Sequence, residues 1–157
     1  MSHEARPDTA ATRGLLLFAH GARDPLWARP FQAVAARCRS ARGESPDADP
    51  SHSRVALAFL EFMQPGLIAA GAQLAASGCQ QVDIVPLFLG AGGHVRKDLP
   101  ALVMQLRAQH PSVAWQLRRA VGEADAMVEA MAGIALTAQA LPEVQLSDPA
   151  EPSTSAP

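Results

Sequence analysis

Cysteine is scarce in this 157-residue chain, and long apolar runs are missing from it. The two cysteines, Cys38 and Cys79, are too few for a disulfide scaffold, and they do not form the Cys-x-x-Cys spacing of a zinc or redox pair. We therefore expect two reduced thiols and a cytoplasmic protein. Apolar runs stay below ten residues and the N-terminal segment is polar, which excludes a membrane span and a secretory signal.

Charge is also low, at 18% of residues against 48% apolar residues, and this balance is typical of one compact domain. Residues 1–119 carry a net charge of +4, whereas residues 120–157 carry −6 and no basic group. Neither block is basic enough for a nucleic-acid surface. A local cationic mouth for an anionic small molecule remains compatible with these charges.

Three polar, proline-containing segments divide the chain. Residues 1–13 and 142–157 are expected to be disordered ends, and residues 43–53 to be a loop. The segment between the two ends, 14–141, is predicted to be a single domain.

Within that domain, short apolar runs alternate with helical periodicity. The runs predict strands at 15–19, 55–60, 82–89 and 113–117. Pro86 is unusual in a strand because proline removes a ladder donor. Helices are expected to begin at Asp24–Pro25, at Pro65, and at Asp98 with Pro100, and Gly78 is placed to end the second. The apolar positions of these helices are Phe31, Val34, Ala35 and Cys38, then Leu67, Gly71 and Leu74, then Leu99, Leu102, Val103 and Leu106.

A last helix is predicted from the spacing of Met127, Met131, Ile134 and Ala138, and its methionines, like Met63, are interpreted as core residues. Four strand-helix units imply a four-stranded parallel sheet in a three-layer α/β sandwich. Ligands of open parallel sheets bind outside the carboxyl ends of the strands. Polar residues at those ends are therefore the first candidates for function.

Three groups with metal or proton chemistry follow the first three strands. His20 ends the first, Glu61 ends the second, and the glycine-rich loop 90–94 that ends in His94 follows the third. Two imidazoles and a carboxylate suit cobalt, nickel, iron or zinc, and fewer than four protein ligands leave open coordination positions. Each residue alone also has a structural interpretation: a turn histidine, or a glutamate that caps the helix near Pro65 or pairs with Arg54. The convergence of all three residues on one edge of the sheet favours a metal or proton-transfer site.

The glycines and cations beside these residues extend the predicted site. Gly90, Gly92 and Gly93 allow a bulky flat ligand to approach the backbone, or backbone N–H groups to hold a phosphate, although the spacing matches no common phosphate loop. The nearby cations favour a carboxylate-rich ligand, with a solvated surface as the alternative. These cations are Arg23, Arg96 and Lys97.

The motifs LFAHGARDP at 17–25, AFLE at 58–61 and VPLFLGAGGHV at 85–95, followed by KDLP, resemble those of the small CbiX-type chelatases over residues 14–136. The resemblance implies a chelatase-like fold, a homodimer, and insertion of a divalent ion into sirohydrochlorin for cobalamin synthesis. The ion is expected to be Co²⁺, whereas close relatives insert Fe²⁺ or Ni²⁺. It also implies that His20 and His94 bind the metal and assist pyrrole deprotonation, with Glu61 as a further metal ligand. The tetrapyrrole would contact Arg23, Gly92, Gly93, Arg96 and Lys97.

The sequence departs from the family pattern at three places. Ala22 stands where serine is usual, the 43–53 loop is longer than in minimal members, and His-rich or cysteine-bearing tails are absent, which argues against an iron–sulfur cluster. Two other functions stay open from the residues: a tetrapyrrole or metal carrier without turnover, and a phosphate-binding α/β enzyme that uses the glycine loop.

Overall fold

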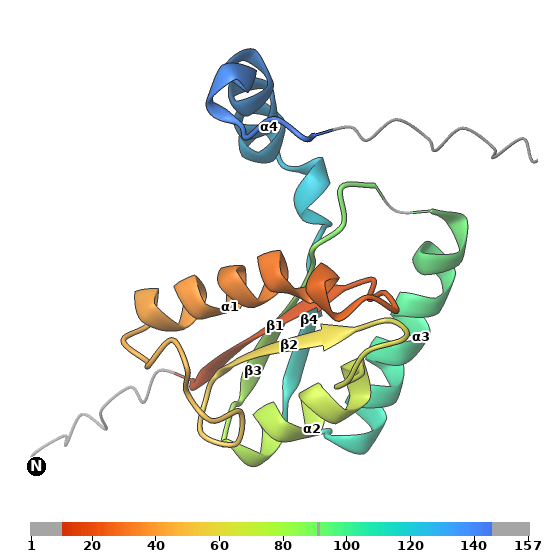
Figure 1. Cartoon of the computed structure of the whole chain (residues 1–157). Helices are drawn as coiled ribbons and strands as arrows, with labels where there is room; N and C mark the ends of the chain where they lie inside the picture. Colours follow the sequence, from red (N-terminus) through yellow and green to blue (C-terminus); the bar gives the residue numbers. More distant parts are fainter. Residues whose placement is uncertain (1–10, 91, 146–157) are drawn as a thin grey trace, which may run out of the picture.

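The protein folds into one parallel sheet with helices on both faces (Figure 1). This computed structural model describes residues 11–90 and 92–145, except for the side chains of residues 94–96 and 140. The strands are β1 (Arg13–Ala19), β2 (Val55–Phe59), β3 (Gln81–Pro86) and β4 (Ala114–Leu117). They pair in the order β2-β1-β3-β4, and every pairing is parallel. The predicted three-layer α/β class is confirmed.

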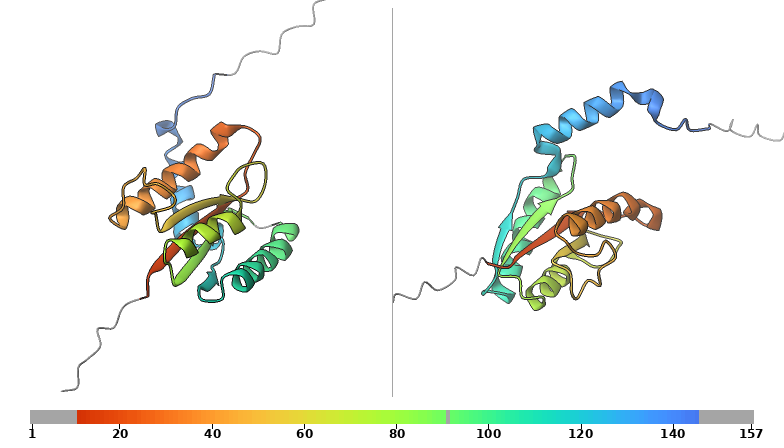
Figure 2. Two further views of the ribbon diagram at one scale, coloured as in Figure 1. Left: turned by 90° about the horizontal axis from the view of Figure 1, so that it is seen from below. Right: turned by 90° about the vertical axis from the view of Figure 1, so that its left-hand side faces the viewer.

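Helices α1 (Arg29–Ala41), α2 (Leu67–Ala76) and α3 (Gly93–Gln109) form the outer layers of this sandwich. Figures 1 and 2 show α1 on one face of the sheet and α2 with α3 on the other. The larger core lies on the α2 and α3 side, where Leu16, Phe18 and Ile84 are fully buried. The smaller core joins Leu17 and Val55 to Ala35 of α1.

Local sequence explains where the first two helices begin and end. The Asp24 carboxylate accepts the Leu26 N–H at 2.9 Å and starts a short 3-10 turn, Pro25–Ala28, that leads into α1. In α1, Ala35 is buried but Val34 is 40% exposed, so the apolar face is narrower than its spacing predicts. Helix α2 begins two residues after Pro65, and Gly78 follows its C-terminal cap with φ +80°.

Two strand details depart from the expected boundaries. Arg13 already belongs to β1, so the first strand begins two residues before the expected start at residue 15. β3 ends at Pro86, three residues earlier than expected, and the next N–H, from Leu87, donates to the Phe18 carbonyl at 2.7 Å. Pro86 is therefore tolerated in an internal strand because it is the strand's last residue.

α3 begins at Gly93, five residues before the expected start at Asp98, and Pro100 lies inside it. The glycines of the segment 90–93 conceal this start because glycine disfavours a helix. Val95 lies four residues before Leu99, at helical spacing, but the glycines that precede it favour a loop. His94 consequently lies in the first turn of a helix and not in a loop.

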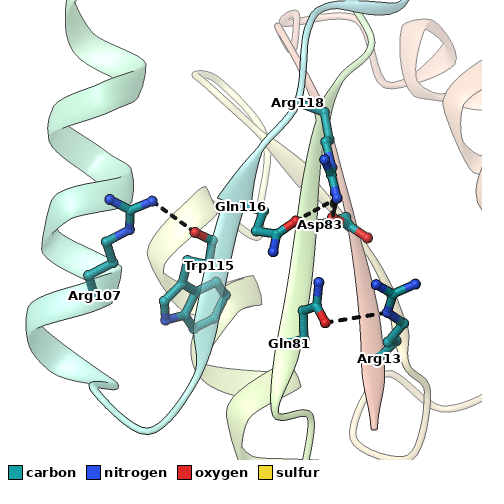
Figure 3. Close-up of polar contacts among 7 residues, drawn as sticks. All are labelled: Arg13, Gln81, Asp83, Arg107, Trp115, Gln116 and Arg118. Atoms are coloured by element: carbon teal, nitrogen blue, oxygen red, sulfur yellow. Dashed lines mark hydrogen bonds and ion pairs between the residues drawn. The ribbon is translucent and has the colours of Figure 1, made fainter. Parts of the chain in front are cut away.

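The edge strand β4 has one buried and one polar face, as its alternation predicts. Trp115 is 2% exposed, and its carbonyl accepts a hydrogen bond from the Arg107 guanidinium at 2.9 Å. On the opposite face, Arg118 pairs with Asp83 at 2.6 Å, beside Gln116 (Figure 3). α1 covers the β1 and β2 half of that face, which leaves polar side chains over β3 and β4.

The last helix, α4 (Asp125–Leu136), corrects the prediction that its methionines are core residues. No residue of α4 is buried, and Met131 and Ile134 are 47% and 54% exposed. Ala138 lies beyond it in a 3-10 turn, Ala138–Ala140. Figures 1 and 2 show α4 extending away from the three layers, so its apolar spacing meets no partner within the described chain. No helix among residues 11–90 and 92–145 is long and apolar enough to cross a bilayer.

Candidate functional site

Strand order gathers the candidate residues at one edge of the sheet. His20 follows β1, Glu61 follows β2 by two residues, and Gly92 to His94 follow β3 after a short loop. Because β1 lies between β2 and β3, His20 sits at the centre of this carboxyl edge. The glutamate segment is on one side of it and the glycine segment on the other.

His20 is held from two directions. Its ring is partly buried and lies against Phe88, with the ring centroids 4.2 Å apart and the planes tilted by 33°. Phe88 is 2% exposed and packs edge-on against Phe18 in the main core. The His20 carbonyl accepts the Glu61 N–H at 3.0 Å. The His20 ring is therefore held in place by packing against the buried Phe88, a residue that the sequence did not single out.

Gly21 allows the histidine and glutamate segments to touch. Its φ is +91°, and a Cβ atom there would lie 1.9 Å from the Glu61 carbonyl oxygen. Any side chain would thus collide with the backbone of the second candidate residue. The glycine after the histidine in LFAHGARDP has a steric role that spacing alone does not reveal.

Glu61 is exposed, and neither structural alternative for it is present among the described residues. α2 has no side-chain cap at its N-terminus, and no described ion pair joins Glu61 to Arg54. The Arg54 N–H instead donates to the Glu44 carboxylate at 3.1 Å. The Glu61 carboxylate is left accessible at the carboxyl edge.

The glycine loop leads directly into α3. Gly92 is the N-terminal cap residue, with φ −67° and ψ 161°, and Gly93 is the first helical residue. Nothing lies within 4 Å of a Cβ atom built at either position, so the space above this backbone is open. Ala91 and the side chains of His94 and Arg96 lie outside the described residues.

The segment after β4, a 3-10 turn at Val121–Glu123, packs against the backbone at the carboxyl edge. Gly122 donates its N–H to the Phe88 carbonyl at 2.9 Å, and a Cβ atom there would lie 2.0 Å from the Leu89 oxygen. A glycine at this position lets the chain after β4 press against the backbone that carries Phe88. The position of Phe88 beside His20 is fixed in this way.

Among the described side chains, no group of three His, Cys, Asp or Glu residues is close enough to hold a metal ion. The predicted third ligand, His94, is outside that set. The described donors are one imidazole and one carboxylate, which suit a borderline divalent ion with open coordination positions. A metal ion bound by so few protein ligands can be released readily to another ligand.

Two of the predicted cations lie exposed at this edge. The Arg23 guanidinium lies over the Phe62 ring, with Cζ 5.3 Å from its centroid. Lys97 lies in the second turn of α3, beside the glycine loop. Phe62 is a further residue that the sequence did not single out.

The parallel sheet in the order β2-β1-β3-β4 with its covering helices is an α/β fold of the chelatase-like class, which solved CbiX and SirB structures share. Residues 14–135 match the family model described as CbiX, so the chain belongs to the CbiX family. The predicted family is confirmed.

Named relatives agree with this assignment. The chain is 30% identical over 94 residues to a sirohydrochlorin cobaltochelatase of Sulfurisphaera tokodaii, a match that covers 60% of this chain and 70% of that protein. It is 32% identical over 90 residues to a protein of the same name from Saccharolobus solfataricus, covering 57% of this chain and 62% of that one. The matched region is thus less than two thirds of the second relative.

Solved structures share the fold. A crystal structure described as a putative cobalamin biosynthesis CbiX protein from Marinobacter aquaeolei has a TM-score of 0.66 and 28% identity, and the match covers 81% of this chain and 97% of that one. SirB from Bacillus subtilis with Fe³⁺ has a TM-score of 0.64 and 19% identity, with 83% of this chain and 48% of that chain covered. The second likeness concerns the fold alone.

Proposed function

We propose that this protein inserts a divalent metal ion into sirohydrochlorin, with Co²⁺ as the physiological ion, in cobalamin biosynthesis. The observation that carries the proposal is the central position of His20, braced by Phe88 and joined through its backbone to the Glu61 segment. The CbiX match and the two relatives named as cobaltochelatases support the reaction.

In the proposed reaction the metal is a substrate and not a resident cofactor. His20, Glu61 and His94 hold the partly hydrated ion at the carboxyl edge. Binding of the ion to the macrocycle displaces two pyrrole protons, and the neutral imidazoles of His20 and His94 accept them. A neutral imidazole has a free ring nitrogen that can accept such a proton.

The tetrapyrrole is proposed to lie over the open glycine backbone at Gly92 and Gly93, where a flat ligand can approach closely. Arg23, Arg96 and Lys97 would bind its carboxylates. Ala22 leaves this edge without the hydroxyl that serine usually supplies there. Two free thiols, Cys38 and Cys79, support a reducing compartment, and we propose the cytoplasm.

A homodimer completes the proposal, and α4 supplies its contact surface. Its exposed apolar residues are Val128, Met131, Ile134 and Leu136. A twelve-residue helix is marginal alone in water and gains stability by burying an apolar face. The net charge of −6 on residues 120–157 complements the +4 of the remaining chain, which favours α4 of one copy against the body of another.

Substitution of the histidines tests the reaction. We expect His20→Ala and His94→Ala each to abolish Co²⁺ insertion, measured by the absorbance change of sirohydrochlorin, without loss of the circular dichroism of the fold. His52→Ala is the matched control because His52 is exposed in the 43–53 loop. Full activity in both folded variants would show that the site is wrong.

Sedimentation equilibrium tests the dimer. The wild type should have twice the chain mass of 16.5 kDa, and Met131→Lys with Ile134→Lys should return it to one chain. Met104→Lys, at a 68% exposed position of α3, should leave the dimer intact. A wild-type mass of one chain at micromolar concentrations, with activity proportional to protein, would refute the dimer.

A further inference from the structure

Phe62 has an unusual backbone conformation for a bulky residue. Its φ is +61°, while its side chain is 61% exposed. The Met63 N–H donates to the Glu61 carbonyl at 2.8 Å, which closes a three-residue γ-turn with Phe62 at the centre. A γ-turn with positive φ is rare and strained. Exposure of the ring means that core packing does not offset this strain.

The neighbouring contacts prevent the turn from relaxing. The Glu61 N–H is bonded to the His20 carbonyl, and Gly21 lies against the Glu61 oxygen. On the other side, Met63 packs against the small buried cluster of Ala19, Ala28 and Phe59. The structure thus holds an aromatic ring in solvent at the carboxyl edge. Strained residues of this kind cluster at binding and catalytic sites.

Arg23 gives the exposed ring a charged neighbour. Its Cζ atom lies 5.3 Å from the ring centroid, within the range of a cation–π contact. Asp24, the next residue, is engaged with the Leu26 N–H. No ion pair involves Arg23 in the part of the chain that the structure describes. Its guanidinium therefore remains available to an anionic ligand.

We propose that Phe62 and Arg23 form a stacking platform for the flat, carboxylate-bearing macrocycle. The Phe62 ring packs against a face of the conjugated ring system, and Arg23 pairs with a carboxylate at its rim. Aromatic stacking and charge pairing then act together on one ligand. This inference rests on the proposed function, since it assigns the substrate's position within that site. The platform binds and orients the macrocycle, and it takes no part in proton transfer.

The first experiment measures binding of metal-free sirohydrochlorin by absorbance titration. Phe62→Ala should raise Kd by about three- to tenfold, the range expected for one aromatic contact. Phe62→Trp should keep wild-type affinity, whereas Phe62→Leu, which is apolar but not flat, should bind as Phe62→Ala does. Met104→Ala, at an exposed site on α3, should have no effect. Equal Kd values for wild type, Phe62→Ala and Phe62→Leu would overturn the platform.

Thermal unfolding of Phe62→Gly separates binding from structure. Glycine adopts positive φ without strain, so the variant should unfold at or above the wild-type temperature while binding sirohydrochlorin more weakly. A lower unfolding temperature together with unchanged affinity would assign Phe62 a structural role and overturn the proposal.

A third experiment tests the contribution of the Arg23 charge to sirohydrochlorin binding. Arg23→Gln should weaken binding and reduce its dependence on salt, because one ionic contact is lost. An unchanged salt dependence would contradict the role of Arg23. If the wild type itself does not bind sirohydrochlorin, the proposed function fails, and this result differs from wild-type binding that is insensitive to Phe62.

Discussion

Replacing Gly21 with alanine tests the steric joint between the histidine and glutamate segments. The added Cβ atom would lie 1.9 Å from the Glu61 carbonyl oxygen, whereas real Cβ contacts are essentially never below 3.0 Å. The carbonyl must therefore retreat by at least 1.1 Å, the difference between these distances. That shift strains the 2.8 Å hydrogen bond from the Met63 N–H to the Glu61 oxygen.

The magnitude of this effect has two parts. Alanine with positive φ costs about 1–2 kcal/mol, and a weakened hydrogen bond adds about 1 kcal/mol. We expect Gly21→Ala to lower the free energy of unfolding by about 2–3 kcal/mol, and Tm by roughly 4–12 °C. Gly78→Ala is the matched control, because Gly78 also has positive φ, +80°, but nothing lies within 4 Å of its Cβ position.

Urea and thermal unfolding followed by circular dichroism provide the assay. Gly78→Ala should lose only about 1–2 kcal/mol, the conformational part. Gly21→Ala should also lose insertion activity at temperatures where it is fully folded, since His20 and Glu61 move apart. Equal destabilisation by the two substitutions would refute the proposed contact between Gly21 and Glu61.

Three further predictions concern other residues. Ser53 is 1% exposed and its hydroxyl donates to the Glu44 carboxylate at 2.6 Å, so Ser53→Ala should cost about 2 kcal/mol in urea unfolding, and Ser77→Ala, at an exposed hydroxyl, much less. Burial raises the pKa of the Cys79 thiol, so a disulfide reagent at pH 8 should modify Cys38 first, and equal labelling rates would contradict this order. The burial of the neutral Cys79 thiol should also make the free energy of unfolding fall as the pH rises past about 8.5. Replacing Arg96 and Lys97 with glutamine should raise KM for sirohydrochlorin more than it lowers kcat, and unchanged kinetics at low salt would assign both to a solvated surface.

β1 and β2 were predictable because each is a short apolar run that is mostly buried, and β4 because its apolar and polar residues alternate. The four predicted strands match β1 to β4 within three residues at each end. The start of α3 was missed because the glycine-rich segment 90–93 favours a loop, although Val95 and Leu99 already have helical spacing. Pro100 suggested a helix start, yet it lies within the helix.

The exposure of α4 was not predictable, because the spacing of apolar residues does not show which surface their face packs against. Met131 and Ile134 have helical spacing, and they are exposed because α4 leaves the sandwich. The spacing would be the same for a core helix and for an interface helix. Only the three-dimensional arrangement distinguishes the two.

The candidate site shows a similar division. The position of His20 and Glu61 at one edge follows from strands that could be read in the sequence. The contacts that brace them come from tertiary structure: Phe88 against His20, and Gly21 against Glu61. The sequence did not indicate a binding role for Phe62, because its exposure and its positive φ depend on the turn in which it lies. The roles of the site residues remain predictions.

Multiple-turnover insertion by the wild-type protein is the most direct test of the proposed function. Sirohydrochlorin in large excess would be mixed with Co²⁺, Fe²⁺ or Ni²⁺ under anaerobic conditions, and metallated product followed by absorbance. Affinity alone would not identify the ion, because binding follows the Irving–Williams order. The proposal predicts many equivalents of product per protein, fastest with Co²⁺, and none above the uncatalysed rate with His20→Ala. Product limited to one equivalent per site, or an equal rate with His20→Ala, would contradict it.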